Sequence, residues 1–476
     1  MPTLLGIDVG TSGAKAVLID QDGRVVASAS AEYPLSIPKP LWAEQDPQDW
    51  WQGVQDCLAQ IPQTPDVIGL TGQMHGSVFL DESDEVIRPA ILWNDQRTAD
   101  ECAQMDRAIG PERLRRITCN PPLTGFQAPK VLWLRNHEPE NFRRLRSVLL
   151  PKDYIRFRLT GQKLTEVSDA SGTGLLDVPH RRWSLEMLAD LDLDPALLPP
   201  VHESDEPTSS TAAGTPVVGG GGDQAAGAVG TGAVSPGVVS VSLGTSGVVF
   251  TALDRPEYDP EGAAHTFCHA NRAWHAMGVM LSCGGALRWA RDTLFPGHSY
   301  DEISALAAEA PPGSEGLTFL PYLTGERCPH NDPTARGALN GLTLSHGPSH
   351  LARAVFEGIS FGLLDAMRLL EGLGARADEI RVTSGGAKSR FWLQMLADMF
   401  GKPCVTLECD EGPAYGAAVL AGVGLGLWPD VSTGCRQVVR LRHRVEPSGT
   451  DYAEAYKRYR DLYPRLKVDD RRRPLT

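Results

Sequence analysis

Short runs of hydrophobic residues alternate with polar turns at the start of the chain. Apolar runs cover residues 4–7, 14–19 and 24–29, and the turns at 10–13 and 20–23 separate them. Turns this short join neighbouring antiparallel strands rather than parallel ones. We therefore predict three consecutive strands that form a meander at the N-terminus.

A helical pattern and a further strand follow this meander. In "DPQDWWQGVQDCLAQI", Asp46 stands where an N-cap is expected and Pro47 occupies the first helical position. Residues 67–71 are continuously apolar, which predicts a buried strand after the helix. Strand, turn, strand, helix and strand in this order indicate an α/β domain.

The strand–turn–strand pattern returns near the middle of the chain. Residues 238–243 and 248–252 are apolar and flank Gly-Thr-Ser-Gly at 244–247, the same tetrapeptide that stands at 10–13. A separation of about half the chain is larger than a solenoid repeat and indicates duplication of a whole domain. We predict an N-terminal domain at 1–232 and a C-terminal domain at 238–440, with a helix and tail at 441–476.

Two later patterns add elements to this plan. A strand at residues 379–383 is followed by the turn Gly385-Gly386 and by helical periodicity over 388–400. The segment "TDYAEAYKRYRDLYPRL" predicts a helix close to the C-terminus.

Composition excludes several classes of function. The chain has 476 residues, too many for one hydrophobic core, and its net charge of −14 disfavours binding to nucleic acid. It shows neither a signal-peptide pattern nor an apolar segment of membrane-spanning length, so we expect a cytoplasmic protein without a membrane partner. Nine cysteines without a CxxC pair indicate free thiols rather than disulfides or a zinc site.

The two Gly-Thr-Ser-Gly turns are candidate phosphate-binding loops. Glycines and small hydroxyl residues leave backbone N–H groups accessible to an anion. One such turn would be an ordinary hairpin, but two copies in matching contexts favour phosphate binding by Thr11, Ser12 and Thr245.

Two duplicated α/β halves with such loops resemble the actin/hexokinase superfamily. The resemblance implies two ribonuclease H-like domains with an ATP cleft between them. Asp8 precedes the first loop, whereas Ser242 stands at the equivalent position of the second. A carboxylate beside the phosphates can hold Mg²⁺, and a second one would repel the nucleotide. Lys15 is either a further cation of this site or a solvated lysine on a strand.

A run of four glycines ends at a single carboxylate. In "VVGGGGDQAAGAVGTG", Asp223 follows the glycines and opens a helix of small residues. It is either a helix N-cap or a general base that accepts a proton from a sugar hydroxyl. The glycines favour the base because they allow a ligand close to the backbone. The helix N-terminus is expected to lower the pKa of Asp223.

Together these motifs resemble the FGGY family of carbohydrate kinases. The likeness is carried by "GGGDQAAGAVG", "SLGTSG" and "GALNGLTLSHGPSHLARAVFE", and by "FQAPKVLWLRNH", in which Gln127 replaces the usual Ser or Thr. The likeness to the family extends over essentially the whole chain. Within the family, "LWAEQDPQDWW", "GLTGQMHGSVFLD" and "RPAILWNDQR" are most similar to the kinases of D-xylulose.

The resemblance assigns roles to residues of this chain. It implies that Met74 and His75 contact the sugar, that Gln224 helps to hold it, that Asp223 is the proton acceptor and that Asp8 serves activity through the metal. The residues that it places on the nucleotide side are Thr245, Gly284, Gly386 and Arg390.

Several of these residues also allow a structural role. His75 could be a buried histidine bonded to the backbone, and Asp95 and Arg97 could form a structural ion pair instead of contacting substrate. The tryptophans are expected in the core rather than as sugar platforms; they are Trp42, Trp50, Trp51 and Trp93.

The resulting hypothesis is ATP- and Mg²⁺-dependent phosphorylation of D-xylulose to D-xylulose 5-phosphate. Kinases of another ketose or of a polyol, such as ribulose or fuculose, are the alternatives within the family. A non-catalytic actin-like protein that binds sugar or nucleotide is the alternative outside it. The expected partners are D-xylulose and ATP, and a homodimer stays open.

Overall fold

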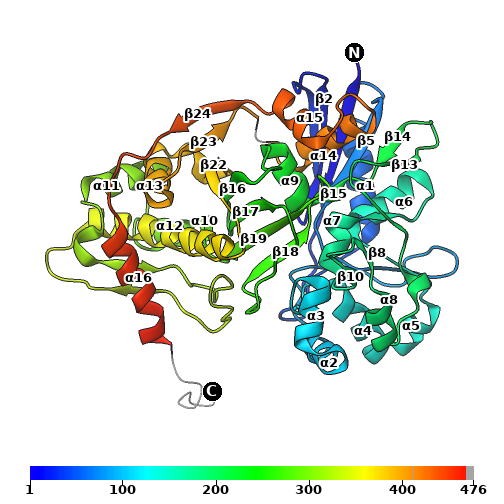
Figure 1. The fold of residues 1–476 in the computed structure, drawn as a ribbon, viewed down its shortest axis with the longest axis horizontal. Helices are drawn as coiled ribbons and strands as arrows, with labels where there is room; N and C mark the ends of the chain where they lie inside the picture. Colours follow the sequence, from blue (N-terminus) through cyan, green and yellow to red (C-terminus); the bar gives the residue numbers. More distant parts are fainter. Residues whose placement is uncertain (410, 468–476) are drawn as a thin grey trace. The chain divides into compact units, whose positions relative to one another are not determined.

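The computed structural model describes residues 1–409 and 411–467 (Figure 1). These residues form two compact units. Unit 1 comprises Met1–Ser235, Ala252–His275 and Cys409–Val439. Unit 2 comprises Pro236–Thr251, Ala276–Glu408 and the chain from Arg440 onward. Two segments of the range 238–440 therefore belong to unit 1, and residues 468–476 of the expected tail lie outside the described residues.

The sheet of unit 1 has the order β13–β14–β5–β1–β2–β3, and β15 also pairs with β5. The pairs β1–β2 and β2–β3 are antiparallel, which confirms the predicted meander, and β5 is parallel to β1. The strands are β1 (Thr3–Val9), β2 (Gly13–Asp20), β3 (Val25–Glu32), β5 (Val67–Gly72), β13 (Pro207–Ser210), β14 (Pro216–Val218) and β15 (Gly221–Gly222).

Helices and short strands surround this sheet. The helices of unit 1 are α1 (Pro47–Leu58), α2 (Ala99–Ile109), α3 (Pro111–Thr118), α4 (Gln127–His137), α5 (Pro139–Arg144), α6 (Pro151–Thr160), α7 (Val167–Ala170), α8 (Leu185–Asp190), α9 (Asp223–Thr231), α14 (Pro413–Gly424) and α15 (Val431–Val438). The short strands are β4 (Glu44–Gln45), β6 (Val78–Leu80), β7 (Ala90–Ile91), β8 (Ser147–Leu149), β9 (Thr165–Glu166), β10 (Leu176–Asp177), β11 (Arg182–Trp183) and β12 (Val201–His202).

Unit 2 repeats the strand plan of unit 1. Its strand β16 pairs antiparallel with β17 and parallel with β22, as β1 does with β2 and β5. The strands are β16 (Gly237–Leu243), β17 (Gly247–Leu253), β19 (Trp274–Met280), β20 (Thr318–Leu320), β21 (Ala338–Asn340), β22 (Ala377–Thr383), β23 (Cys404–Leu407) and β24 (Leu441–Val445). Strand β18 (Ala264–Cys268) is the edge strand of the second seven-stranded sheet, whose order is β18–β19–β17–β16–β22–β23–β24. The helices are α10 (Gly284–Thr293), α11 (Tyr300–Glu309), α12 (Pro348–Gly372), α13 (Arg390–Phe400) and α16 (Ala453–Leu466).

Glycines on both sides of the contact allow α14 to pack closely on the sheet of unit 1 (Figure 1). A Cβ on Gly6 of β1 would lie 1.8 Å from the carbonyl oxygen of Ala414, and one on Gly69 of β5 would lie 2.0 Å from that of Ala417. A Cβ on Gly416 would lie 1.7 Å from the carbonyl oxygen of Ala226 in α9. Only glycine permits so close an approach of backbone to backbone.

Two predicted helices are found with small differences. Asp46 caps α1 by accepting a hydrogen bond from the N–H of Gln48, as predicted. The helix predicted from residue 388 begins at Arg390, because the Ser389 hydroxyl caps it by accepting from the N–H of Trp392. Within the described ranges, no helix is both long and apolar enough to cross a membrane.

Candidate active site

Two carboxylates of unit 1 stand close enough to influence each other's charge. Asp8 lies near the end of β1, and Asp223 is the first residue of α9. Burial raises the pKa of Asp8 to about 7; the negative charge of Asp223 adds to this rise, and Lys15 opposes it. Asp8 Oδ1 is buried without a hydrogen-bond partner among the described residues. A buried carboxylate oxygen of this kind is a fitting ligand for a divalent cation.

Asp223 does not cap its helix. The N-cap of α9 is Gly222 and Asp223 is already the first helical residue, so the N-cap interpretation is wrong. Burial raises the pKa of Asp223 to about 6, although hydrogen bonds from Gln224 favour its charged form. The expected lowering by the helix N-terminus is therefore wrong in direction, because desolvation outweighs it. The side-chain amide of Gln224 lies 3.4 Å from Asp223 Oδ1.

Side chains brace the first phosphate-loop candidate. The Thr11 hydroxyl donates to Gln73 Oε1 at 3.2 Å and accepts from the Trp93 indole at 3.0 Å. The Gln45 amide donates to the backbone oxygen of Thr11 at 2.8 Å, and that of Gln73 donates to Gly10. Trp93 is 45% exposed, so its assignment to the core is wrong, and its indole N–H bonds the loop instead.

Ser12 of this loop and Lys15 of the following strand β2 face different surroundings. Ser12 is exposed at the tip of the turn. Lys15 pairs with Asp8 in the β1–β2 register, and its ammonium forms a 2.6 Å ion pair with Glu411. Both members of this pair are partly exposed, so Lys15 is neither free in solvent nor committed to Asp8 alone.

The loop that carries Met74 and His75, the two residues expected to contact the sugar, packs directly on Gly222, the residue before Asp223. Met74 is buried, and a Cβ on Gly222 would lie 2.9 Å from its Cγ. His75 has a φ of 69° and its Nδ1 lies 2.6 Å from the carbonyl oxygen of Gly172, which is the backbone bond that a structural histidine would make. The His75 ring also stacks on Phe126 with 4.7 Å between centroids. One loop thus carries both predicted sugar residues beside Asp223.

Asp95 and Arg97 form an internal ion pair. Their side chains are almost fully buried with 2.6 Å between the charged atoms, and Arg97 also lies 2.7 Å from Glu44. This geometry confirms the structural alternative.

A cavity of about 600 Å³ in unit 2 brings together most of the predicted nucleotide residues. Thr245, Gly284 and Gly386 line it, whereas Arg390, at the start of α13, does not. Sequence analysis missed several lining residues: Arg288, Tyr300, Asp301, Lys388 and Trp392. Arg288 lies one helical turn after Gly284, a spacing that could have identified it.

The second phosphate-loop candidate borders this cavity and is held by backbone bonds. The N–H of Gly284 donates to the oxygen of Gly244, and those of Cys283 and Gly285 donate to the oxygen of Thr245. A Cβ on Gly284 would lie 2.5 Å from the Gly244 oxygen, so this contact requires glycine.

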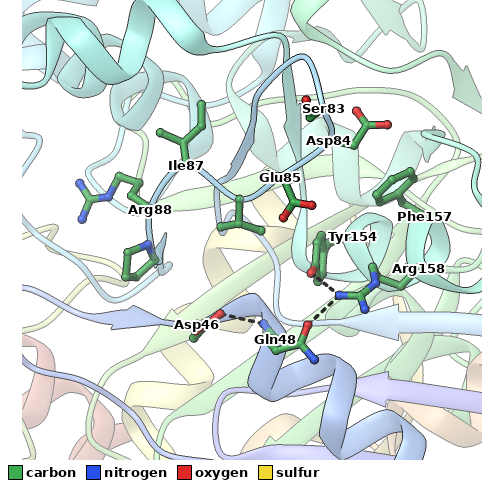
Figure 2. Close-up of a pocket in the computed structure, with 12 residues that line it drawn as sticks. Asp46, Gln48, Ser83, Asp84, Glu85, Ile87, Arg88, Tyr154, Phe157 and Arg158 are labelled. Carbon is green, nitrogen blue, oxygen red and sulfur yellow. Dashed lines mark hydrogen bonds between the residues drawn. The ribbon is translucent and has the colours of Figure 1, made fainter.

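Unit 1 also has a polar hollow of about 690 Å³ beside α1 and α6 (Figure 2). Arg158, which lines it, donates to Gln48 Oε1 at 2.8 Å and to the Tyr154 hydroxyl at 2.7 Å. None of the predicted site residues lines this hollow. Both arginines that line it, Arg88 and Arg158, are already bonded within the protein.

Over the described ranges, no group of three or more His, Cys, Asp or Glu side chains could hold a metal by itself. Mg²⁺ needs no such group, because it is commonly bound by one or two carboxylates together with substrate phosphates. Asp8, whose buried Oδ1 has no hydrogen-bond partner in the described part of the chain, is a carboxylate of the kind that such a site uses.

Comparison with known proteins identifies the family. The N-terminal domain model of the FGGY family of carbohydrate kinases matches residues 3–230, and its C-terminal domain model matches residues 239–425. The chain therefore belongs to the FGGY family of carbohydrate kinases. It has the actin/hexokinase fold with duplicated ribonuclease H-like domains, and it is a sugar kinase that uses ATP.

Individual relatives agree with this assignment. The chain is 44% identical to a xylulose kinase of Escherichia coli over 88% of this chain and 89% of that protein. It matches the crystal structure of a xyloylose kinase from Brucella ovis with a TM-score of 0.92 and 39% identity, covering 98% and 99% of the two chains. A gluconate kinase structure from Lactobacillus acidophilus also matches with a TM-score of 0.92, at 30% identity over 98% and 100%.

Proposed function

We propose that this kinase phosphorylates D-xylulose at its terminal hydroxyl, with Asp223 as the proton acceptor. The observation that carries the proposal is the packing of the Met74-His75 loop against Gly222, the residue before Asp223. A sugar held by this loop would present a hydroxyl to the carboxylate. The names of the E. coli and Brucella relatives support xylulose as that sugar.

The chemistry assigns Asp223 a defined step. The sugar hydroxyl oxygen attacks the γ-phosphorus of ATP, the bond from that phosphorus to the ADP oxygen breaks, and the hydroxyl proton passes to the Asp223 carboxylate. A pKa of about 6 keeps Asp223 ionised at neutral pH and makes it a stronger base than an ordinary aspartate. Gln224, 3.4 Å away, would orient the carboxylate and the sugar.

The remaining predicted residues would serve the nucleotide. Mg²⁺, which would be held by Asp8, neutralises charge on the phosphate oxygens when bound. The amides of the loop that contains Thr11 and Ser12 would meet phosphate, with Lys15 as a neighbouring cation. The cavity lined by Thr245, Gly284 and Gly386 would accept the nucleotide, and Arg390 would act from its rim.

The substrate is tested with a coupled assay of ADP release. D-xylulose, D-ribulose, D-gluconate and glycerol are compared, and we expect D-xylulose to have a kcat/KM at least ~10-fold above the others, equivalent to ~1.4 kcal/mol in transition-state binding. Gluconate is included because of the Lactobacillus structure. A tenfold lead for any other sugar contradicts the proposal.

The base is tested with Asp223→Asn. An amide cannot accept the hydroxyl proton, so kcat should fall at least ~100-fold while the melting temperature and xylulose binding change little. Asp49→Asn, which alters a carboxylate in the first turn of α1, is the control and should keep wild-type turnover. A folded Asp223→Asn enzyme within a few-fold of wild type would show that the base lies elsewhere.

A further inference from the structure

A buried segment under the site touches both the base and the sugar loop. The segment Val167–Thr173 comprises α7 and the short 3₁₀ turn η1 (Ser171–Thr173). At one end, the Ser168 hydroxyl accepts a hydrogen bond from the N–H of Gly222 at 3.1 Å. At the other end, the oxygen of Gly172 lies 2.6 Å from His75 Nδ1. The segment therefore relates Asp223 and His75 through two short contacts.

Ser168 is itself held firmly. It is fully buried, and its hydroxyl donates to Glu166 Oε1 at 3.0 Å. Glu166 also accepts from the N–H of Ser168 and from that of Asp169, which fixes the start of α7. Because the hydroxyl donates to Glu166, its lone pairs point to the N–H of Gly222.

An ionic cluster anchors Glu166. The fully buried Lys152 ammonium lies 2.6 Å from Asp153, 3.6 Å from Glu166 and 3.6 Å from Asp169. Buried charges tolerate little displacement, because a broken pair leaves an uncompensated charge away from water. The cluster gives Ser168 a rigid base on which to hold Gly222.

We propose that Ser168 is a positioning residue that fixes Asp223 relative to the sugar loop through the N–H of Gly222. The inference rests on the proposed role of Asp223 as the base. Asp223 follows Gly222 directly, and Gly222 is both the last residue of β15 and the N-cap of α9, so this hydrogen bond restrains the backbone where the strand turns into the helix. A displacement of the base by about 1 Å can lower the rate of a reaction by up to ~100-fold.

Ser204 offers a matched control. It is fully buried like Ser168, and its hydroxyl donates to the same carboxylate, Glu166 Oε2, at 2.7 Å, but no bond between its hydroxyl and Gly222 is present. Ser168→Ala and Ser204→Ala therefore each remove one hydrogen bond from Glu166. Only Ser168→Ala also releases Gly222.

The experiment compares kcat, the KM for sugar and ATP, and the melting temperature of both variants. Ser168→Ala should lower kcat by ~10-fold or more while both KM values stay within about threefold, because the ligand-contacting residues are unchanged. Ser204→Ala should keep kcat within about twofold of wild type with a similar loss of melting temperature. Ser168→Thr, which retains the hydroxyl, should recover most of the lost kcat.

Two results would overturn the inference: equal kcat in both alanine variants, or a loss in Ser168→Ala that appears only in KM. Should Ser168→Ala fold poorly, Ser168→Cys, which has the same connectivity as serine with a somewhat larger sulfur that accepts hydrogen bonds only weakly, replaces it under the same criteria. The two proposals are separated by Asp223→Asn. Wild-type turnover in that variant removes the proposed base, whereas an inactive Asp223→Asn with an unaffected Ser168→Ala removes only the positioning role.

Discussion

The two Gly-Thr-Ser-Gly loops share a sequence and a strand context but are stabilised differently. In unit 1, side chains hold the loop: Gln45 and Gln73 bond its backbone oxygens, and Trp93 bonds the Thr11 hydroxyl. In unit 2, backbone N–H groups from the start of α10 bond the oxygens of Gly244 and Thr245. The first loop thus depends on a few specific side chains, whereas the second depends on the absence of a side chain at Gly284.

The residue two positions before each loop also differs between the two units. Asp8 carries a buried oxygen without a partner among the described residues, while the Ser242 hydroxyl lies 3.0 Å from that of Ser384. Asp8 therefore keeps an oxygen available for a ligand such as a cation, whereas the Ser242 hydroxyl already has a partner within the chain. The two copies share the Gly-Thr-Ser-Gly turn, and only one of them carries a charge two positions before it.

Among variants that change this difference between the loops, Asp8→Asn should have the largest effect on catalysis. The amide is isosteric but carries no charge for Mg²⁺, so kcat should fall at least ~100-fold while sugar binding stays almost intact, because charge stabilisation at the phosphates dominates phosphoryl transfer. Steady-state kinetics over a Mg²⁺ titration and calorimetry with xylulose measure the two quantities. Ser242→Ala is the control in the other loop. Normal turnover and normal Mg²⁺ dependence in Asp8→Asn would contradict the assignment.

Ser242→Asp should have an intermediate effect by making the loops alike. If the cavity accepts the polyphosphate of ATP as proposed, a carboxylate beside it repels the nucleotide, so the KM for ATP should rise ~10-fold, a change of ~1.4 kcal/mol. Ser242→Asn has nearly the same shape without the charge and should change this KM much less. An equal KM in the two variants would show that the phosphates do not approach Ser242.

Local patterns were sufficient to predict much of the fold and of the site. The alternation of residues 4–29 predicted the meander, and the Asp46-Pro47 pair predicted the start of α1. The repeated tetrapeptide located both loops. These features depend on near neighbours in the sequence or on one residue type. The resemblance to the family, rather than a local pattern, grouped Thr245, Gly284 and Gly386, which line one cavity.

Features that depend on tertiary contacts were missed. Helix α14 is apolar on all sides, so its pattern did not reveal that its glycine and alanines pack on β1, β5 and α9 of unit 1. The pKa of Asp223 is raised by burial that no local pattern reports. Trp93 is exposed and bonds Thr11, which is 82 residues away in the sequence, so no local pattern reports this contact.

The smallest expected effect is on stability, and it also separates the two loops. Asp8 has a pKa of about 7 in the folded protein and 3.8 as its ordinary value. At a pH between 3.8 and 7, Asp8 is protonated in the folded protein and ionised in the unfolded chain, so unfolding releases a proton. The free energy of unfolding of the metal-free enzyme therefore falls as the pH rises toward 7. The difference corresponds to ~4 kcal/mol at most. Asp8→Asn removes this titration, so in EDTA its melting temperature should exceed that of wild type by roughly 2 °C or more at pH 8 and by less at pH 5. Ser242→Asn, which alters the loop without a buried carboxylate, should show a difference that does not vary with pH. A pH-independent offset in Asp8→Asn would mean that Asp8 ionises in the folded protein at its ordinary pKa.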